Sequence, residues 1–244
     1  MWTKCILVGS AACAFVAMTA CTIDEDYGKT EHETKTVDVG KAESVRAEID
    51  MGVGQLNIKG DASKLLEADF TYNRRDWKPD VTYNGNSFRG LLTIRQGDHG
   101  GGGVHLGGNN EYEWDLRFND NIPLDIRVNC GAGEGNLDLQ RLTIRDLDVN
   151  MGVGRVEAEL PPEPKRDYDV RIHGGIGEAV LHLPSKVGVV ADASGGIGGI
   201  QVEGLQKRGG RWVNDIYEKG ASPVTVHVQV QGGIGQIRLL AGGA

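Results

Sequence analysis

Met151-Gly-Val-Gly-Arg-Val-Glu-Ala158 decides the fold, because five other segments of the chain repeat its pattern. Each copy has Met or a small residue, a Gly, an aliphatic residue or Ala, and a second Gly. A predicted strand with alternating side chains follows. The copies begin at Met51, Cys130, Met151, Gly174, Gly195 and Gly232. Six copies of one pattern in 244 residues indicate a repeat architecture.

The residues that flank the motifs alternate between aliphatic and polar, as in Val45, Ala47 and Ile49 before the first copy. This period of two predicts half-buried strands, so each copy is a strand, a glycine corner and a second strand. We expect the glycines to allow a bend with φ > 0 while the aliphatic residue between them points inward. The twelve corner glycines are Gly52, Gly54, Gly131, Gly133, Gly152, Gly154, Gly175, Gly177, Gly196, Gly198, Gly233 and Gly235.

Stacking these units about 4.8 Å apart would pair each strand with a copy above and a copy below it. The sequence therefore predicts an all-β fold, a repeat-containing β-solenoid or rack. An antiparallel sandwich of hairpins is the alternative architecture. We prefer the solenoid because the corner itself recurs, as rungs in register require.

The chain divides into four predicted regions. Residues 1–20 form a signal peptide, since the segment from Cys5 to Ala20 is apolar or small, uncharged and too short for a membrane span. Residues 21–43 are polar and acidic and form a flexible tether. Residues 44–122 form an N-terminal β subdomain that contains most of the aromatic residues, and residues 123–244 form the C-terminal repeat solenoid.

The signal peptide ends in Met18-Thr-Ala-Cys21, which resembles a bacterial lipobox. The resemblance implies a lipid on Cys21 and export to the membrane, on the outer-membrane or periplasmic side where an outer membrane exists. An ordinary signal peptide cut near Ala20, or an uncleaved anchor, is the alternative. With Cys21 lipidated, Cys130 would have no disulfide partner, and we expect it to be a buried small apolar residue.

The net charge of −8 argues against nucleic acid as a partner, because such binding needs a basic face. The glycine motifs lack the third glycine and the following helix of a dinucleotide site, so no cofactor is expected. No nucleophile elbow, metalloprotease motif or paired-cysteine zinc motif occurs in the sequence. We therefore expect no catalytic residues and no metal.

Four groups of polar or aromatic residues are candidate sites. The residues before the motifs form a polar row that faces solvent or satisfies corner amides, with ligand binding as the alternative: Asp50, Asn129, Asn150, His173, Ser194 and Gln231. Asp98, His99 and His105 lie in a Gly-rich segment and are expected to be solvated rather than to bind a metal. We expect His173, His182 and His227 to face water. Trp212 and Tyr217 belong to an insertion that either covers a sheet edge or contacts a sugar or protein partner.

Residues 45–96 resemble the N-terminal toast-rack family of bacterial envelope proteins, through Gly52-Val-Gly54, Tyr72-Asn73, Trp77-Lys-Pro79 and Leu92-Thr-Ile-Arg95. Residues from about 122 to 240, including Trp212-Val-Asn-Asp-Ile-Tyr217, are similar to the C-terminal rack of that family. They also resemble, more loosely, adhesin-like β-solenoids and the extracytoplasmic domain of LiaF-type cell-wall-stress regulators. The resemblance implies a β-rich scaffold without an established catalytic centre.

These observations predict a lipid-anchored, non-catalytic envelope protein whose rack binds another envelope protein or a glycan. A sensor or regulator of envelope stress, related to LiaF-type proteins, is the alternative. A carbohydrate-active enzyme is a weaker alternative, because the Asp and Glu residues show no recognisable catalytic pair.

Overall fold

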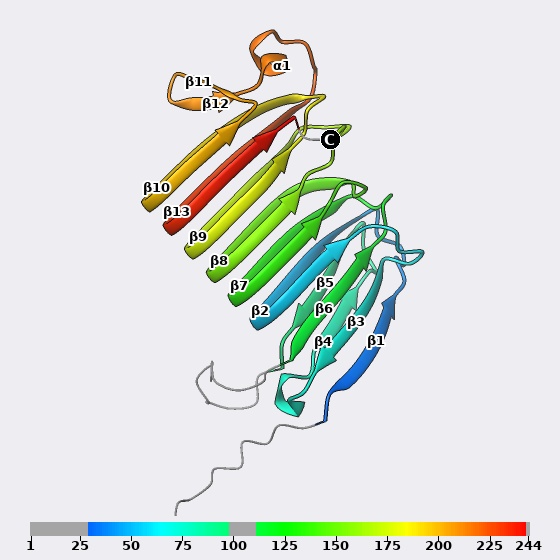
Figure 1. The fold of residues 1–244 in the computed structure, drawn as a ribbon. Helices are drawn as coiled ribbons and strands as arrows, with labels where there is room; N and C mark the ends of the chain where they lie inside the picture. The colour runs from blue at the N-terminus through cyan, green and yellow to red at the C-terminus, as the bar shows by residue number, and fades with distance from the viewer. Residues whose placement is uncertain (1–28, 98–110, 243–244) are drawn as a thin grey trace, which may run out of the picture.

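The computed structural model describes residues 29–97 and 111–242. The predicted signal peptide and Cys21 lie outside the described residues, as do Asp98, His99 and His105. The described part is one sheet of 13 strands with two short helical segments (Figure 1). Its elements are β1 (Glu31–Val37), β2 (Ser44–Lys59), β3 (Leu66–Tyr72), η1 (Arg75–Trp77), β4 (Asp80–Asn84), β5 (Arg89–Arg95), β6 (Tyr112–Phe118), β7 (Leu124–Asp138), β8 (Ile144–Glu159), β9 (Tyr168–Leu183), β10 (Gly188–Glu203), β11 (Gln206–Arg208), β12 (Arg211–Val213), α1 (Asp215–Glu218) and β13 (Thr225–Ala241).

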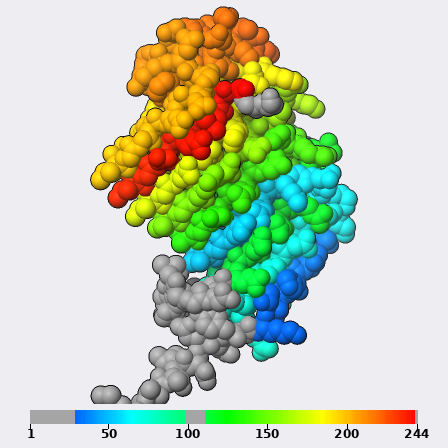
Figure 2. Space-filling model, in the orientation of Figure 1, coloured from blue at the N-terminus to red at the C-terminus, as the bar shows by residue number. Residues whose placement is uncertain are grey.

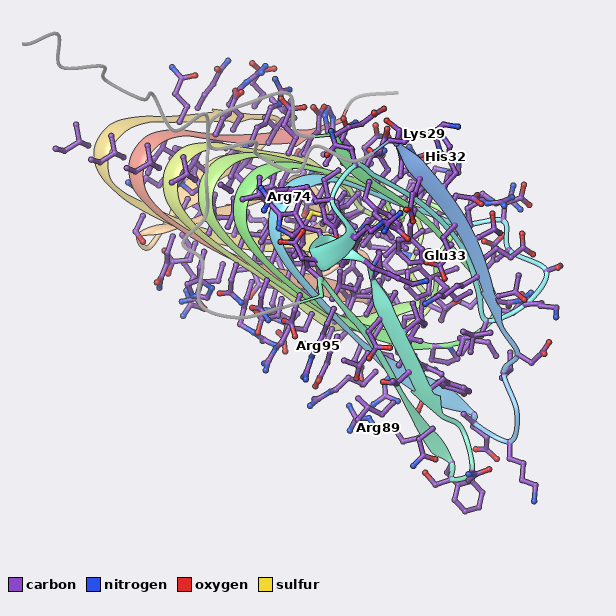
Figure 3. The ribbon with its side chains drawn as sticks, turned by 90° about the horizontal axis from the view of Figure 1, so that it is seen from below. Lys29, His32, Glu33, Arg74, Arg89 and Arg95 are labelled. Carbon is purple, nitrogen blue, oxygen red and sulfur yellow. The ribbon has the colours of Figure 1, made fainter. Side chains whose placement is uncertain are left out.

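Six long strands carry the six glycine motifs, and each strand bends at its motif. They stack in parallel and in register in the order β2, β7, β8, β9, β13, β10. Seen along the stack, the strands nest inside one another with their bends on one side (Figure 3). We call the part of each strand before the bend the first arm and the part after it the second arm. The solenoid prediction is confirmed, and the parallel pairing excludes the sandwich of hairpins.

The core lies between the two arms. Val45, Ala47 and Ile49 on the first arm of β2 are fully buried, and Leu56 and Ile58 on its second arm are 1% exposed. The alternation read in the sequence thus places one face of each arm inward and the other toward solvent. Each further rung adds its own inward residues from both arms. Contacts are therefore mainly between neighbouring rungs, as in other repeat proteins.

The order of the last two rungs differs from their order in the chain. β13 lies between β9 and β10, with Ile234 beside both Ile176 and Ile197. β10 therefore follows β9 in the chain but is not its neighbour in the sheet. β13, which comes later in the chain, occupies the place between them. β11, β12 and α1 lie between β10 and β13 in the chain, which explains why the last motif spacing is longer than the three before it.

The predicted N-terminal subdomain continues the same sheet. The first arm of β2 pairs with β5, and its second arm pairs with β6, so the sheet divides into two layers beyond β2. Phe70 on β3 and Trp114 on β6 are buried and pack edge to face, with ring centroids 5.5 Å apart. The aromatic residues therefore close one end of the core.

Part of the predicted tether is a strand. β1, from Glu31 to Val37, pairs antiparallel with β3, which corrects the expectation of a flexible segment there. Its polar side chains have partners on neighbouring elements: Thr34 donates to Asp69 at 2.7 Å, and Lys78 lies 3.2 Å from Glu33. An acidic, polar segment can thus form an edge strand when its charges are paired.

Candidate binding surface

The second glycine of each motif makes the bend. The φ angles of these six glycines lie between 137° and 147°, a region that other residues rarely adopt. A Cβ added to Gly133 would lie 1.8 Å from the carbonyl oxygen of Gly54 on the neighbouring strand. Backbone conformation and close stacking therefore both require glycine at this position.

The first glycine of each motif has a different role. Its φ is outside the left-handed region, but a Cβ on Gly175 would lie 2.3 Å from the carbonyl oxygen of Gly152. Glycine is therefore required at this position because the backbone of the neighbouring rung lies too close for a side chain. The positive φ that we predicted around the corner is confined to the second glycine.

The aliphatic residue between the two glycines points outward, so the prediction that it points inward was wrong. Val153 is 51% exposed, Ile176 52%, Ile234 49% and Ile197 71%. The inside of the bend has no room for it, because the first and sixth motif residues already meet there: Met151 is 5% exposed and Val156 is 2% exposed.

These outward side chains form a continuous apolar row, which we call the corner ridge: Val53, Ala132, Val153, Ile176, Ile234 and Ile197, in spatial order. Eight large apolar residues are exposed in the described part of the chain, and four of them belong to the ridge. Scattered exposed apolar residues are normal, but a contiguous row often marks an interaction surface. Sequence reasoning missed this surface, because the same residues were assigned to the core.

The residues at the inside of the bend differ between the first three rungs and the last three. Met51, Cys130 and Met151 fill it in the first three rungs. Gly174, Gly232 and Gly195 take the equivalent places in the last three. A hollow of about 80 Å³ remains there, lined by these glycines and by Ile237 and Ile200. This volume holds at most a few small groups, so the hollow is a packing defect at this end of the stack rather than a ligand cavity.

Cys130 is the free cysteine of the described part, and it is buried. Burial raises the pKa of its thiol to about 11, because the thiolate would be desolvated between the arms. A reactive cysteine needs a lowered pKa and access to solvent. Cys130 therefore behaves as a core residue, in the same structural place as Met51 and Met151.

The polar row beside the corner forms hydrogen bonds within itself. Asn129 donates to Asp50 at 2.7 Å, and Asn150 donates to Asn129 at 3.0 Å. Arg95 also donates to Asp50, at 3.1 Å. These side chains link successive rungs, so the first part of the row has a structural role. His173, Gln231 and Ser194 continue the row in register on the later rungs.

The insertion that contains Trp212 and Tyr217 covers part of the last rung. We call residues 204–224 the flap; it lies at the end of the stack (Figure 2). β12 pairs with the first arm of β10, where Trp212 lies beside Ala191. The buried Asn214 accepts from the backbone N–H of Val189 at 3.0 Å and donates to the carbonyl of Val187 at 2.7 Å. The edge-covering interpretation fits this geometry.

The two aromatic residues of the flap differ in exposure. Trp212 is half-buried, with the ammonium of Lys207 5.3 Å from its ring centroid, whereas Tyr217 is 43% exposed. A cation beside an indole ring stabilises the flap itself. Of the two candidate partner contacts, Tyr217 is the more exposed.

Several acidic groups of the described residues lie in ion pairs. Asp125, the carboxylate buried there, contacts Arg89 and lies 3.3 Å from Arg145. The pKa of Glu157 is lowered by hydrogen bonds from Arg155 and His182, which disfavours the proton that a general acid must carry. Within residues 29–97 and 111–242, no three His, Cys, Asp or Glu side chains are grouped to hold a metal ion.

The three histidines of the predicted strands lie on two neighbouring rungs, His173 and His182 on β9 and His227 on β13. Of these three, only His182 contacts an acidic group, Glu157 at 3.2 Å. In the part of the chain that the structure describes, no helix is long and apolar enough to cross a membrane.

Comparison with known protein families identifies the family of this chain. Residues 26–182 match the model described as the N-terminal domain of toast_rack. The chain belongs to the toast-rack family. The match runs through the predicted boundary at residue 122, as does the continuous pairing of β2 with β7.

One solved structure shares the fold of this toast-rack chain. A candidate cell adhesion protein from Clostridium sporogenes is 33% identical, with a TM-score of 0.83; the match covers 88% of this chain and 100% of that one. A candidate adhesin from Bacteroides fragilis is 11% identical with a TM-score of 0.33, and covers 86% of this chain and 96% of that one. No curated protein matches the chain.

Proposed function

We propose that this toast-rack protein is a lipid-anchored, non-catalytic binding module of the bacterial cell envelope, and that the corner ridge is its binding surface. The observation that carries the proposal is the row of exposed aliphatic side chains at the bends, from Val153 to Ile197. These side chains belong to a hydrogen-bonded stack, so they are held at fixed spacing before a partner arrives. Such preorganisation lowers the entropic cost of binding.

The chemistry of the ridge favours a protein partner over a glycan. Val153, Ile176, Ile234 and Ile197 offer branched aliphatic groups flanked by glycines, whereas sugars are usually held by aromatic rings and polar groups. A partner with an apolar strip or a row of shallow apolar notches would match the ridge. The similar structure from Clostridium sporogenes, a candidate cell adhesion protein, supports a binding role.

Two properties of the described residues support a non-catalytic role. The buried carboxylate of Asp125 lies in ion pairs, and Cys130 is buried with a raised pKa.

Photo-crosslinking in intact cells tests the binding surface. A photoreactive amino acid would replace Ile176 on the ridge and, as a matched control, Leu91 on β5, which is 43% exposed. We expect residue 176 to capture a defined envelope protein, identified by mass spectrometry, and residue 91 to capture none. Equal capture at both positions, or capture at neither, would contradict the proposal.

Membrane anchoring needs its own test, since it depends on Cys21. We expect Cys21→Ser to release the chain from the membrane fraction. Retention of the Ser variant in that fraction would show a different anchor, and would leave the role of the ridge to the crosslinking result.

A further inference from the structure

The last rung of the stack has an uncovered second arm. Residues Gly199–Glu203 of β10 pair with β13 on one side. The flap pairs with β10 only through Val190 and Ala191, on the first arm. The backbone N–H and C=O groups on the outer side of residues 199–203 are therefore free to pair with another strand. At the other end of the stack, β5 and β6 cover both arms of β2.

The core is also open at this arm. Ile200 and Val202 continue the inward rows of Ile237 and Leu239, which are 4% and 0% exposed. Ile200 itself is 42% exposed, because no rung lies beyond it. Terminal repeats of solenoids normally carry a polar cap, and natural edge strands carry Lys, Pro or a bulge. The arm Gly199-Ile-Gln-Val-Glu203 has a single charge, at its end.

We propose that a second copy of this chain covers the arm, through antiparallel pairing of residues 199–203 with the same residues of the other copy. A two-fold axis at Gln201 sets Ile200 of each copy opposite Val202 of the other. Both residues point to the inner face, so the two cores become continuous. On the outer face, Gln201 meets Gln201 and Glu203 meets Gly199.

This pairing is self-complementary. Two apolar cross-strand pairs form, and no like charges stand opposite one another, although like charges would weaken such a pair. The pairing also removes the free edge from both copies at once. Because each copy uses the same arm in the two-fold pairing, the interface is isologous and the assembly stops at two copies. The inference goes beyond the proposed function, since it concerns neither the corner ridge nor the anchor.

A charge exchange at Gln201 tests the proposal directly. Gln201 is exposed and faces outward, so its replacement leaves the core unchanged. Full-length chains with two different tags would be produced together in one cell and purified through one tag. We expect two wild-type chains to purify together, and Gln201→Glu with Gln201→Glu, or Gln201→Lys with Gln201→Lys, to do so about tenfold less. Gln201→Glu with Gln201→Lys should restore the association.

Cysteine crosslinking supplies an independent measurement in the intact envelope. Residues directly opposite in an antiparallel pair lie within disulfide distance. We therefore expect Gln201→Cys to give a disulfide-linked dimer, whereas Gln229→Cys, an exposed residue of β13 away from the edge, gives none.

Four results would overturn the proposal. They are a wild-type chain that does not associate with itself, association that is indifferent to both charges, a Glu–Lys pair that fails to restore it, and equal crosslinking at positions 201 and 229. Unchanged thermal melting of the Gln201 variants would show that a loss of association does not reflect unfolding.

Discussion

The carbonyl oxygen of Gly54 lies 1.8 Å from the place that a Cβ on Gly133 would occupy. This relationship recurs between successive rungs, and it explains the glycine content of the motif better than bending alone. A side chain at the bend would have to push two hydrogen-bonded strands apart. The corner is therefore a site where sequence is fixed by the neighbouring rung.

Gly133→Ala should destabilise the protein by at least about 2 kcal/mol, because Ala meets both an unfavourable φ and the carbonyl of Gly54. Gly199→Ala is the matched control, since a Cβ there has no neighbour within 4 Å. Its effect should stay within about 0.5 kcal/mol. Denaturant unfolding measures both. Similar stabilities for the two variants would refute the stacked-corner geometry.

Gly174→Ala should stabilise the protein by about 0.5–1 kcal/mol, because it fills part of the hollow and reduces the entropy of the unfolded chain. The added Cβ would have only the carbonyl of Gln231 nearby, at 4.0 Å. Gly232→Ala should raise the stability less, since its Cβ would lie 3.2 Å from Cδ1 of Ile237. Thermal melting of the two variants compares them. A lower melting temperature for Gly174→Ala than for wild type would show that the hollow is not free space.

The pKa of Cys130 predicts a stability change at high pH. The thiol has a pKa of about 11 in the folded chain against an ordinary value of 9.0, so the unfolded chain loses its proton first as pH rises. The thiol's contribution to stability is therefore complete below pH 9 and lost as pH rises through 11. The loss amounts to about 2–3 kcal/mol.

Cys130→Ala removes this group and serves as the comparison. The difference in unfolding free energy between wild type and variant should be constant below pH 9 and should shrink toward pH 11. Tyrosines titrate in both proteins and cancel in the difference. A difference that is independent of pH would mean that the thiolate forms equally easily in the folded chain.

The spatial order of the rungs can be tested with paired cysteines on the ridge. Ile176 and Ile234 are directly paired, and neighbouring strands are about 4.8 Å apart, which suits a disulfide. Ile176 and Ile197 are separated by β13, at about twice that spacing. Oxidation should link Ile176→Cys with Ile234→Cys but not with Ile197→Cys. The reverse result would mean that the rungs follow chain order.

Much of the fold could be predicted from the sequence, because the motif and its alternating flanks report directly on bends and on buried rows. Val45, Ala47 and Ile49 lie in the core as their spacing indicates. The position of β13 could not be predicted, since Gly195 and Gly232 begin nearly identical motifs and nothing local distinguishes the neighbours of each.

The outward direction of the ridge was also hidden from pattern analysis. In a straight strand, Ile176 would share a face with Gly174, but the alternation is interrupted at the corner: Gly174 takes the inward place of Met151, whereas Ile176 is 52% exposed. A tight bend has little volume inside it and ample space outside. Counting the residues that compete for the inside, such as Met151 and Val156, would have given the right answer.

The most direct test of the account is the affinity of the protein for a preparation of cell envelope after the ridge is made polar. Val153, Ile176 and Ile234 would be replaced together by Ser, with Phe88→Ser, which removes a 78% exposed apolar residue outside the ridge, as the control. We expect at least about a tenfold loss of binding for the ridge variant, corresponding to about 1.4 kcal/mol, and wild-type binding for the control. A ridge variant that melts like wild type and binds as tightly would contradict the claim that the corner ridge is the binding surface.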